Sequence, residues 1–148
     1  MKRIYLAGPM FCASEKNFNA ELTDMLENAG YSVFLPQRDG MEAAFIENMS
    51  ENEKALAIFR LDTSEILKAD ALVMVLDGRV PDEGACVELG IAYSNGKPCY
   101  GIKTDVRTAE RGMDINPMLT GCFKEIFRAE EKAAALKMLE DFISDNGL

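Results

Sequence analysis

The sequence predicts an α/β fold with a parallel sheet, and two patterns lead to this prediction. Short apolar runs typical of strands alternate along the chain with longer segments in which apolar residues recur at helical spacing. Residues 71–76 are apolar without interruption, as expected of a central strand that helices cover on both faces. The chain has 148 residues, and we predict that residues 1–148 form a single domain.

Five strands are expected, most of them bounded by residues that favour turns. Gly8-Pro9 ends the first strand, Pro36 ends the second and Asp77-Gly78 ends the third. Asn95-Gly96 precedes the fourth strand, whereas the fifth is only a short run. The strands are expected over residues 2–7, 31–35, 71–76, 98–102 and 124–128.

Helices are expected between the strands. Ser14 is the expected N-cap of the first helix, and the second helix is expected to be broken near Ser50. Asp62 shares an otherwise apolar face of that second helix with Ile58 and Phe59, so it is either a structural hydrogen-bond acceptor or a site residue. The helices are expected over residues 14–29, 43–69, 84–94 and 129–145, with loops over 36–42 and 103–121.

The composition narrows the chemistry that the chain can perform. It contains no histidine, which excludes Ser-His catalysis, Cys-His catalysis and His-ligated zinc. The 25 acidic residues make carboxylates the leading candidates for acid, base and nucleophile. The four cysteines have neither metal-site nor redox spacing, and we expect reduced, mostly buried thiols.

Charge and hydropathy bear on the partners. A net charge of −9 disfavours a nucleic-acid polymer as partner, because an acidic surface repels phosphates. No stretch approaches the ~18 apolar residues of a membrane helix, and the N-terminal apolar run is too short for a signal peptide. We therefore expect a cytoplasmic protein that acts on a small neutral ligand and does not bind a membrane.

The site is expected at the carboxyl ends of the strands, near the point where the strand order reverses. Residues 8–13, 36–40 and 77–84 form loops after the first three strands. Neither a G-x-G-x-x-G nor a G-x-x-x-x-G-K-[ST] motif occurs, which disfavours a dinucleotide or a triphosphate as ligand.

The best candidates for chemistry lie within Asp-Glu-Gly-Ala-Cys-Val-Glu-Leu-Gly, residues 82–90. Gly84 is expected to let the chain turn into a helix that places Glu88 near its first turn, where the helix N-terminus keeps a carboxylate ionised. Asp82 precedes the helix, and two carboxylates in different environments suit glycosidic chemistry. A glutamate in this place also commonly does no more than complement the helix dipole. Gly90 indicates either close approach by a ligand or tight packing of the helix on the sheet.

Four segments of the chain together resemble the nucleoside 2-deoxyribosyltransferase family. They are Tyr-Leu-Ala-Gly-Pro-Met-Phe at 5–11, Asp77-Gly78, Asp-Glu-Gly-Ala-Cys-Val-Glu-Leu-Gly-Ile-Ala at 82–92 and Asn-Pro-Met at 116–118. The resemblance runs from residue 4 to about residue 120. It implies a flavodoxin-like three-layer sandwich with a five-stranded, mostly parallel sheet, and neither a cofactor nor a metal ion.

The resemblance also implies roles for individual residues. Glu88 would attack C1′ of a 2′-deoxynucleoside and form a covalent glycosyl-enzyme, from which a second nucleobase takes the sugar. Asp82 would protonate and recognise the base, Asp62 would belong to the site, and Tyr5 would orient the Glu88 carboxylate. Substrate contacts are implied for Gly8, Pro9, Phe11, Gln37, Gly84, Asn116 and Met118. Because the last two match residues that reach a neighbouring subunit's sugar, we expect a homodimer or larger homo-oligomer with shared sites.

Two other functions stay open. Related 2′-deoxynucleoside 5′-monophosphate N-glycosidases use the same glutamate but let water attack, and Arg38 or Arg79 could bind the phosphate of such a substrate. Asp82, Asn116 and Met118 favour transfer over this hydrolysis. The other alternative is a domain that binds a nucleoside or nucleotide without turnover, which the joint presence of the four catalytic candidates disfavours.

Overall fold

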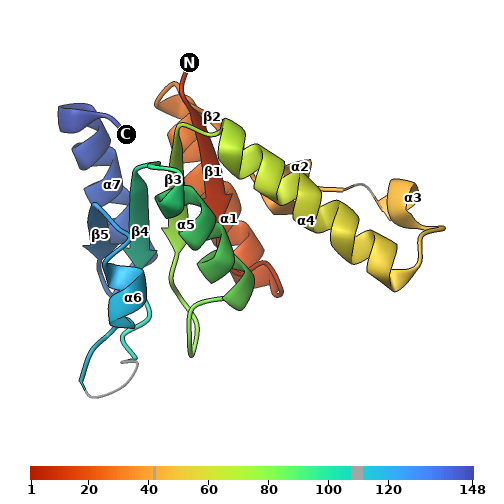
Figure 1. Ribbon diagram of the computed structural model, residues 1–148. Helices are drawn as coiled ribbons and strands as arrows, with labels where there is room; N and C mark the ends of the chain where they lie inside the picture. Colours follow the sequence, from red (N-terminus) through yellow and green to blue (C-terminus); the bar gives the residue numbers. More distant parts are fainter. Residues whose placement is uncertain (42, 108–111) are drawn as a thin grey trace.

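The computed structural model describes residues 1–41, 43–107 and 112–148. These form three layers, with a sheet in the middle and helices on either side (Figure 1). All neighbouring strands are parallel, in the order β2-β1-β3-β4-β5. The strands are β1 (Arg3–Ala7), β2 (Ser32–Phe34), β3 (Ala71–Val75), β4 (Cys99–Lys103) and β5 (Glu125–Arg128). The chain order reverses between β1 and β3, as in flavodoxin-like folds. The predicted fold class is confirmed, and each strand lies within one residue of its predicted bounds.

Helices cover both faces of the sheet. One face carries α1 (Ala13–Asn28) and α7 (Lys132–Asn146), and the other carries α4 (Glu51–Lys68) and α5 (Glu83–Ser94). Three one-turn helices lie in the connections, namely α2 (Pro36–Asp39), α3 (Ala43–Ile46) and α6 (Pro117–Thr120). Ser50 is the N-cap of α4, which confirms the predicted break between α3 and α4.

The alternation of side chains along β1 decides which core each residue joins. Ile4 and Leu6 pack with α1 and α7, whereas Tyr5 and Ala7 pack with α4 and α5. Successive side chains of a strand point to opposite faces of the sheet. Tyr5 is therefore directed toward the face that carries α5.

Three local predictions are wrong. Helix α1 is capped by Cys12 and not by Ser14, because the Glu15 carboxylate accepts hydrogen bonds from the N–H groups of Phe11 (2.8 Å) and Cys12 (3.0 Å). The expected loop after β2 begins with helix α2, since Pro36 occupies a first-turn position that suits its fixed φ. The thiols are free, but most are not buried: Cys99 is buried, Cys86 and Cys122 are partly exposed, and Cys12 is exposed.

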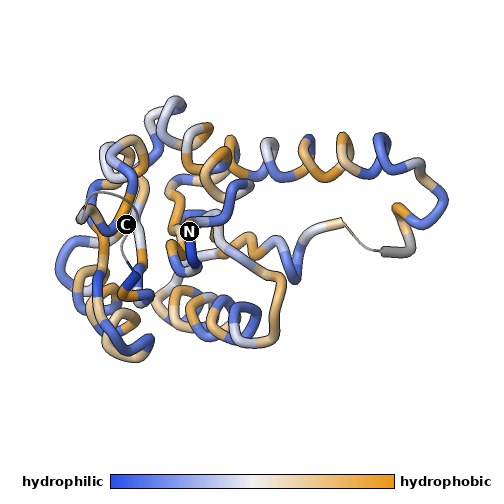
Figure 2. The backbone as a smooth tube through the Cα atoms, turned by 90° about the horizontal axis from the view of Figure 1, so that it is seen from below, coloured by the Kyte–Doolittle hydropathy of each residue, from blue (hydrophilic) through white to orange (hydrophobic). Residues whose placement is uncertain are grey.

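Helix α3 and the N-terminal half of α4 extend beyond the sheet as an arm (Figures 1 and 2). The apolar face predicted for α4 is consequently only partly buried. Ile66, near the end that packs on the sheet, is buried, whereas Ile58 and Phe59 are 42% and 56% exposed. The periodicity identified the helix but not how much of it rests on the core. Within the described ranges, no helix is both long enough and apolar enough to span a bilayer.

Candidate functional site

A cavity of about 300 Å³ opens at the carboxyl ends of β1, β2 and β3, where the strand order reverses. Its walls come from the loops after these three strands and from helices α4 and α5. The lining residues are Gly8, Met10, Phe11, Pro36, Asp62, Asp82, Glu83, Gly84 and Glu88. The cavity lies where the strand order and the three loops predicted a ligand site.

Tyr5 and Glu88 meet beneath this cavity. The Tyr5 hydroxyl donates a hydrogen bond to Glu88 Oε1 at 2.7 Å. The Tyr5 ring is fully buried and stacks on Phe34, with ring centroids 5.5 Å apart. Burial, followed by the nearby Glu88 carboxylate, raises the pKa of Tyr5 well above its ordinary range. Tyr5 is therefore a fixed hydrogen-bond donor that orients Glu88.

Burial also controls the charge of Glu88. It raises the pKa of Glu88 from 4.5 to about 7. The hydrogen bond from Tyr5 opposes this rise, whereas the negative charges of Asp62 and Asp82 add to it. A carboxyl whose pKa lies near neutrality can exchange between its two protonation states at working pH.

The predicted reason for the ionisation of Glu88 is wrong. Helix α5 begins at Glu83 with Asp82 as its N-cap, so Glu88 lies in the second turn and not the first. The stabilisation of an anion by a helix N-terminus falls off within the first turn. The group that favours the carboxylate form of Glu88 is the Tyr5 hydroxyl.

Asp82 lies at the start of α5 and at the cavity wall. Its Oδ2 accepts a hydrogen bond from the Ala85 N–H at 2.8 Å. A Cβ atom on Gly84 would lie 3.1 Å from Asp82 Oδ2, and Gly84 does not have a positive φ. Gly84 thus leaves room for the Asp82 carboxylate and does not provide the sharp turn that was predicted.

Asp62 comes from the half of α4 that packs on the body of the protein. It is half-buried and lines the cavity, and burial raises its pKa. Its place in the cavity wall is consistent with the site-residue interpretation, which stays a prediction. Asp62, Asp82 and Glu88 converge on one cavity from two helices.

Pro9 and Gln37 support the cavity without lining it. The buried Asn19 donates through Nδ2 to the Pro9 carbonyl (2.9 Å) and to Gln37 Oε1 (3.1 Å). Gln37 Nε2 in turn donates to the Lys16 carbonyl at 2.9 Å. Gln37 is therefore held between α1 and α2 and is not among the residues that line the cavity, and its contact with a base stays a prediction. Asn19 was not predicted as a supporting residue, although an amide on the apolar face of a helix could have indicated it.

Asn116 and Met118 also lie outside this chain's own cavity. Asn116 caps the short helix α6, with its Oδ1 accepting a hydrogen bond from the Met118 N–H at 2.9 Å. The Met118 side chain is 80% exposed. Both residues are on the surface, and none of the residues that the structure describes covers the methionine.

Three lining residues were not predicted. Met10 belongs to the first motif segment and follows Gly8-Pro9, and Pro36 follows the second strand, so both had a positional signal. Glu83 had none, because an acidic residue at the start of a helix is common.

Three residues with predicted contacts lie elsewhere. A Cβ atom on Gly90 would meet no atom of the described residues within 4 Å, so tight packing of the helix on the sheet does not account for this glycine, and close approach by another group stays a prediction. Arg38 is paired with Glu27 (2.9 Å) and with Asp39 (2.8 Å). Arg79 is exposed and is not among the residues that line the cavity.

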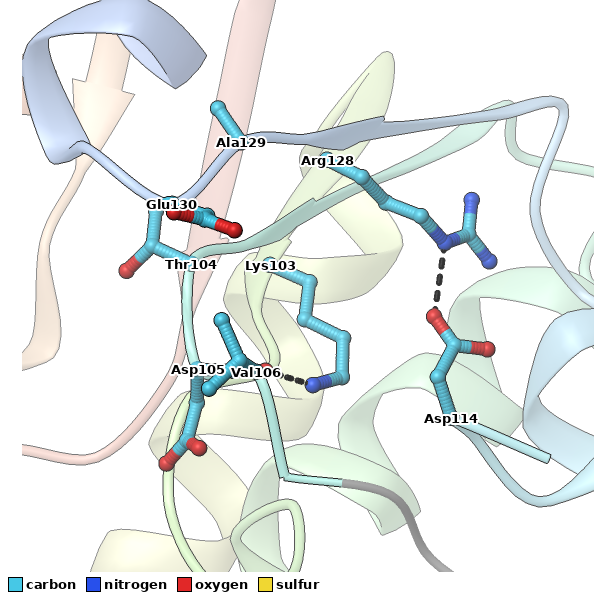
Figure 3. Close-up of a pocket in the computed structure, with 8 residues that line it drawn as sticks. All are labelled: Lys103, Thr104, Asp105, Val106, Asp114, Arg128, Ala129 and Glu130. Carbon is cyan, nitrogen blue, oxygen red and sulfur yellow. Dashed lines mark hydrogen bonds and ion pairs between the residues drawn. The ribbon is translucent and has the colours of Figure 1, made fainter. Parts of the chain in front are cut away.

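A second cavity, of about 330 Å³, lies at the ends of β4 and β5 (Figure 3). Its cationic groups are already engaged: Arg128 Nε pairs with Asp114 at 2.7 Å, and Lys103 Nζ donates to the Asp105 and Arg107 carbonyls. None of the predicted site residues lines it. In the described parts of the chain, no group of three or more His, Cys, Asp or Glu side chains is arranged to hold a metal ion.

The chain was compared with known families and sequences. The model of a family described as nucleoside 2-deoxyribosyltransferase matches residues 4–140. A search of curated proteins gave no match.

Solved structures give a consistent result. A 2-deoxyribosyltransferase from Bacillus psychrosaccharolyticus is 25% identical, covers 94% of this chain and 90% of its own, and superposes with a TM-score of 0.75. A conserved protein from Enterococcus faecalis V583 is 27% identical over 94% of this chain and 99% of its own, with a TM-score of 0.68. A CMP N-glycosidase from Clostridium botulinum is 20% identical over 95% of this chain and 99% of its own, with a TM-score of 0.66, and shares the fold.

Proposed function

The chain belongs to the nucleoside 2-deoxyribosyltransferase family, and on that premise we propose that it transfers the 2-deoxyribosyl group between nucleobases through a covalent intermediate on Glu88. The observation that carries the proposal is the 2.7 Å hydrogen bond from Tyr5 to Glu88, at the edge of a cavity that also holds Asp62 and Asp82. The substrate is a 2′-deoxynucleoside, and the reaction serves nucleoside salvage.

In the first half of the reaction, Glu88 displaces the base. One carboxylate oxygen is held by Tyr5, and the other attacks C1′ as the bond from C1′ to the base nitrogen breaks. The electron pair of that bond passes to the base, which takes a proton from an acidic side chain in the cavity. Tyr5 contributes by donating a hydrogen bond to Glu88, which fixes the direction from which the carboxylate attacks.

Two carboxyls can serve the leaving base. Asp82 is held in position by the Ala85 N–H, which suits recognition and protonation of the base. Asp62, whose pKa burial raises, keeps its proton to a higher pH than an exposed aspartate and is the second proton donor.

In the second half, another base attacks C1′ and Glu88 leaves as a carboxylate. The proton of the incoming base nitrogen returns to the carboxyl that gave one up. Each displacement inverts the configuration at C1′, so two displacements retain the β configuration. No cofactor enters this sequence.

We propose further that the active site is shared between copies of the chain. Asn116 and Met118 lie on the surface and outside their own chain's cavity. In a homodimer or larger homo-oligomer they would complete the sugar site of a neighbouring copy.

Hydrolysis is the second candidate, because water could attack the same Glu88 ester in place of a base. Hydrolysis stays a candidate because a CMP N-glycosidase has the same fold. A domain without turnover is the third candidate. The presence of Asp82 in the cavity wall, together with Asn116 and Met118, supports transfer over both alternatives.

The test is incubation with deoxyinosine, with and without adenine, followed by product analysis. Deoxyadenosine formed only when adenine is present supports transfer. If hypoxanthine and free deoxyribose are the only products, the enzyme is a hydrolase and the transfer proposal is wrong.

Glu88→Ala provides the matched control. The variant is expected to lose base exchange by at least about 10³-fold, because the nucleophile is absent. Its thermal unfolding should remain cooperative, which separates loss of chemistry from loss of fold. Exchange at a rate near wild type in this variant would overturn the covalent mechanism. A deoxyribosyl adduct on Glu88, seen by mass spectrometry, would distinguish an enzyme from a binding domain.

A further inference from the structure

The cavity has an acidic wall. Asp62, Asp82, Glu83 and Glu88 line it, and none of the described lining residues is a lysine or arginine. Arg38, which could have bound a phosphate, is instead paired with acidic partners. Such a wall repels a dianionic group on a substrate, since like charges brought together without cations raise the free energy of binding.

Each of the two helices that begin at the cavity has a carboxylate of the chain at its N-terminus. Helix N-termini are the usual binding sites for phosphate groups, because their first N–H groups have no partner within the helix. In α1, the N–H groups of Phe11 and Cys12 donate to Glu15 Oε2 at 2.8 and 3.0 Å. In α5, the Ala85 N–H donates to Asp82 Oδ2 at 2.8 Å. At the start of both helices a carboxylate of the chain therefore places negative charge beside the backbone N–H groups that could otherwise attract a phosphate.

Glu15, unlike Asp62, Asp82 and Glu88, has no proposed role in the reaction. Its carboxylate does not line the cavity itself but accepts a hydrogen bond from the N–H of Phe11, a residue that does. The hydrogen bonds from the Cys12 and Phe11 backbones lower the pKa of Glu15, which keeps it ionised at neutral pH.

We propose that Glu15 is a specificity-determining residue, whose carboxylate excludes 5′-phosphorylated nucleosides from the cavity. This inference rests on the proposed function, because it concerns the substrates of the same site. It makes the substrate an uncharged nucleoside, selected partly by a side chain that takes no part in the chemistry.

The experiment compares Glu15→Gln with Glu53→Gln. Glutamine at position 15 retains an oxygen to accept the Phe11 and Cys12 hydrogen bonds but removes the charge. Glu53 provides a matched control, since its Oε2 accepts from the Ser50 N–H at 2.8 Å in the same type of cap on α4, away from the cavity. For each protein, kcat/KM is measured with a 2′-deoxynucleoside and with its 5′-monophosphate.

Glu15→Gln is expected to raise the ratio of monophosphate to nucleoside kcat/KM by about tenfold, with the nucleoside value little changed. Glu53→Gln should leave the ratio at its wild-type value. An unchanged ratio in Glu15→Gln, or a wild-type protein that prefers the monophosphate, would overturn the proposal.

Binding separates this proposal from the proposed function. Calorimetry in a Glu88→Ala background gives the Kd of nucleoside and monophosphate without turnover. A monophosphate Kd that tightens about tenfold on adding Glu15→Gln supports the specificity role even if no transfer is found, and an unchanged Kd refutes it. Absence of activity on the nucleoside would count against the proposed function alone.

Discussion

At the residue scale, the central feature is the pair formed by Glu88 and Tyr5. Burial disfavours the ionised form of Glu88, and the Tyr5 hydroxyl favours it. Burial raises the pKa of Glu88 to about 7, and the Tyr5 hydroxyl works against this rise. The two residues are 83 positions apart in the sequence. Their hydrogen bond orients the proposed nucleophile and stabilises its carboxylate form.

Tyr5→Phe tests this pairing. Loss of the hydroxyl removes the group that lowers the Glu88 pKa, so the pKa should rise further above 7. The acidic limb of the kcat/KM pH profile, expected near pH 7 in the wild type, should move to higher pH, and activity at pH 7 should fall about 10- to 100-fold. A variant that lost activity equally at every pH would show that Tyr5 supports only the structure.

Glu88→Gln tests the cost of burying the carboxyl. The folded pKa of Glu88, about 7, lies above its ordinary value of 4.5. The folded state therefore binds the proton more tightly than the unfolded state, and stability falls as the pH rises from 4.5 through 7. Glutamine removes this loss and still accepts from Tyr5.

The expected gain in unfolding free energy is on the order of 1–3 kcal/mol at pH 8 and close to zero at pH 4.5. Thermal or urea denaturation at the two pH values measures it. An equal gain at both pH values would mean that charge burial is not the cause.

At the element scale, helix α5 carries the site on one side and an open surface on the other. Asp82 caps it, and Glu88 reaches the cavity from its second turn. On its outer side, Val87 and Tyr93 are more than half exposed, and a Cβ on Gly90 would meet none of the described residues within 4 Å.

Gly90→Ala should therefore stabilise α5. Alanine in a helix interior is favoured over glycine by about 0.5–1 kcal/mol, and no residue in the described ranges obstructs the added methyl group. Urea denaturation should show this gain. Gly40→Ala is the contrasting variant, because its Cβ would lie 2.4 Å from the Pro36 carbonyl oxygen and should destabilise the turn beside the cavity. A loss of stability in Gly90→Ala would contradict the open surface seen here.

At the scale of the whole molecule, one chain does not bring all the expected substrate contacts together. The surface positions of Asn116 and Met118 are explained if each copy completes the site of another. This arrangement can be tested by complementation between two inactive proteins.

The prediction is that Glu88→Ala and Met118→Ala proteins, each impaired alone, recover activity when they are unfolded together and refolded as mixed oligomers. A mixed dimer contains one site with both an intact Glu88 and an intact Met118 from its neighbour. Random mixing should restore roughly a quarter of wild-type activity. Recovery absent despite mixed oligomers on native mass spectrometry would place Met118 outside the shared site.

Much of the architecture could be predicted from the sequence, because strands and helices follow from local spacing. The five strands and the break at Ser50 depend on apolar periodicity and turn residues, which are properties of a few adjacent residues. The loops that carry Gly8, Phe11 and Asp82 were placed correctly for a related reason, since parallel strands bring their carboxyl ends to one edge of the sheet.

The sequence by itself determined the element order, the fold class and the restriction to carboxylate chemistry. Only the tertiary structure decided that Glu88 lies in the second turn of α5 and is hydrogen-bonded to a buried tyrosine, that Gln37 is held by Asn19, and that half of α4 extends beyond the core. These outcomes depend on which surfaces meet across long distances in the chain. Burial, and through it the pKa of Glu88, is set by that packing, because desolvation depends on every group that surrounds the carboxyl and not on its neighbours in sequence.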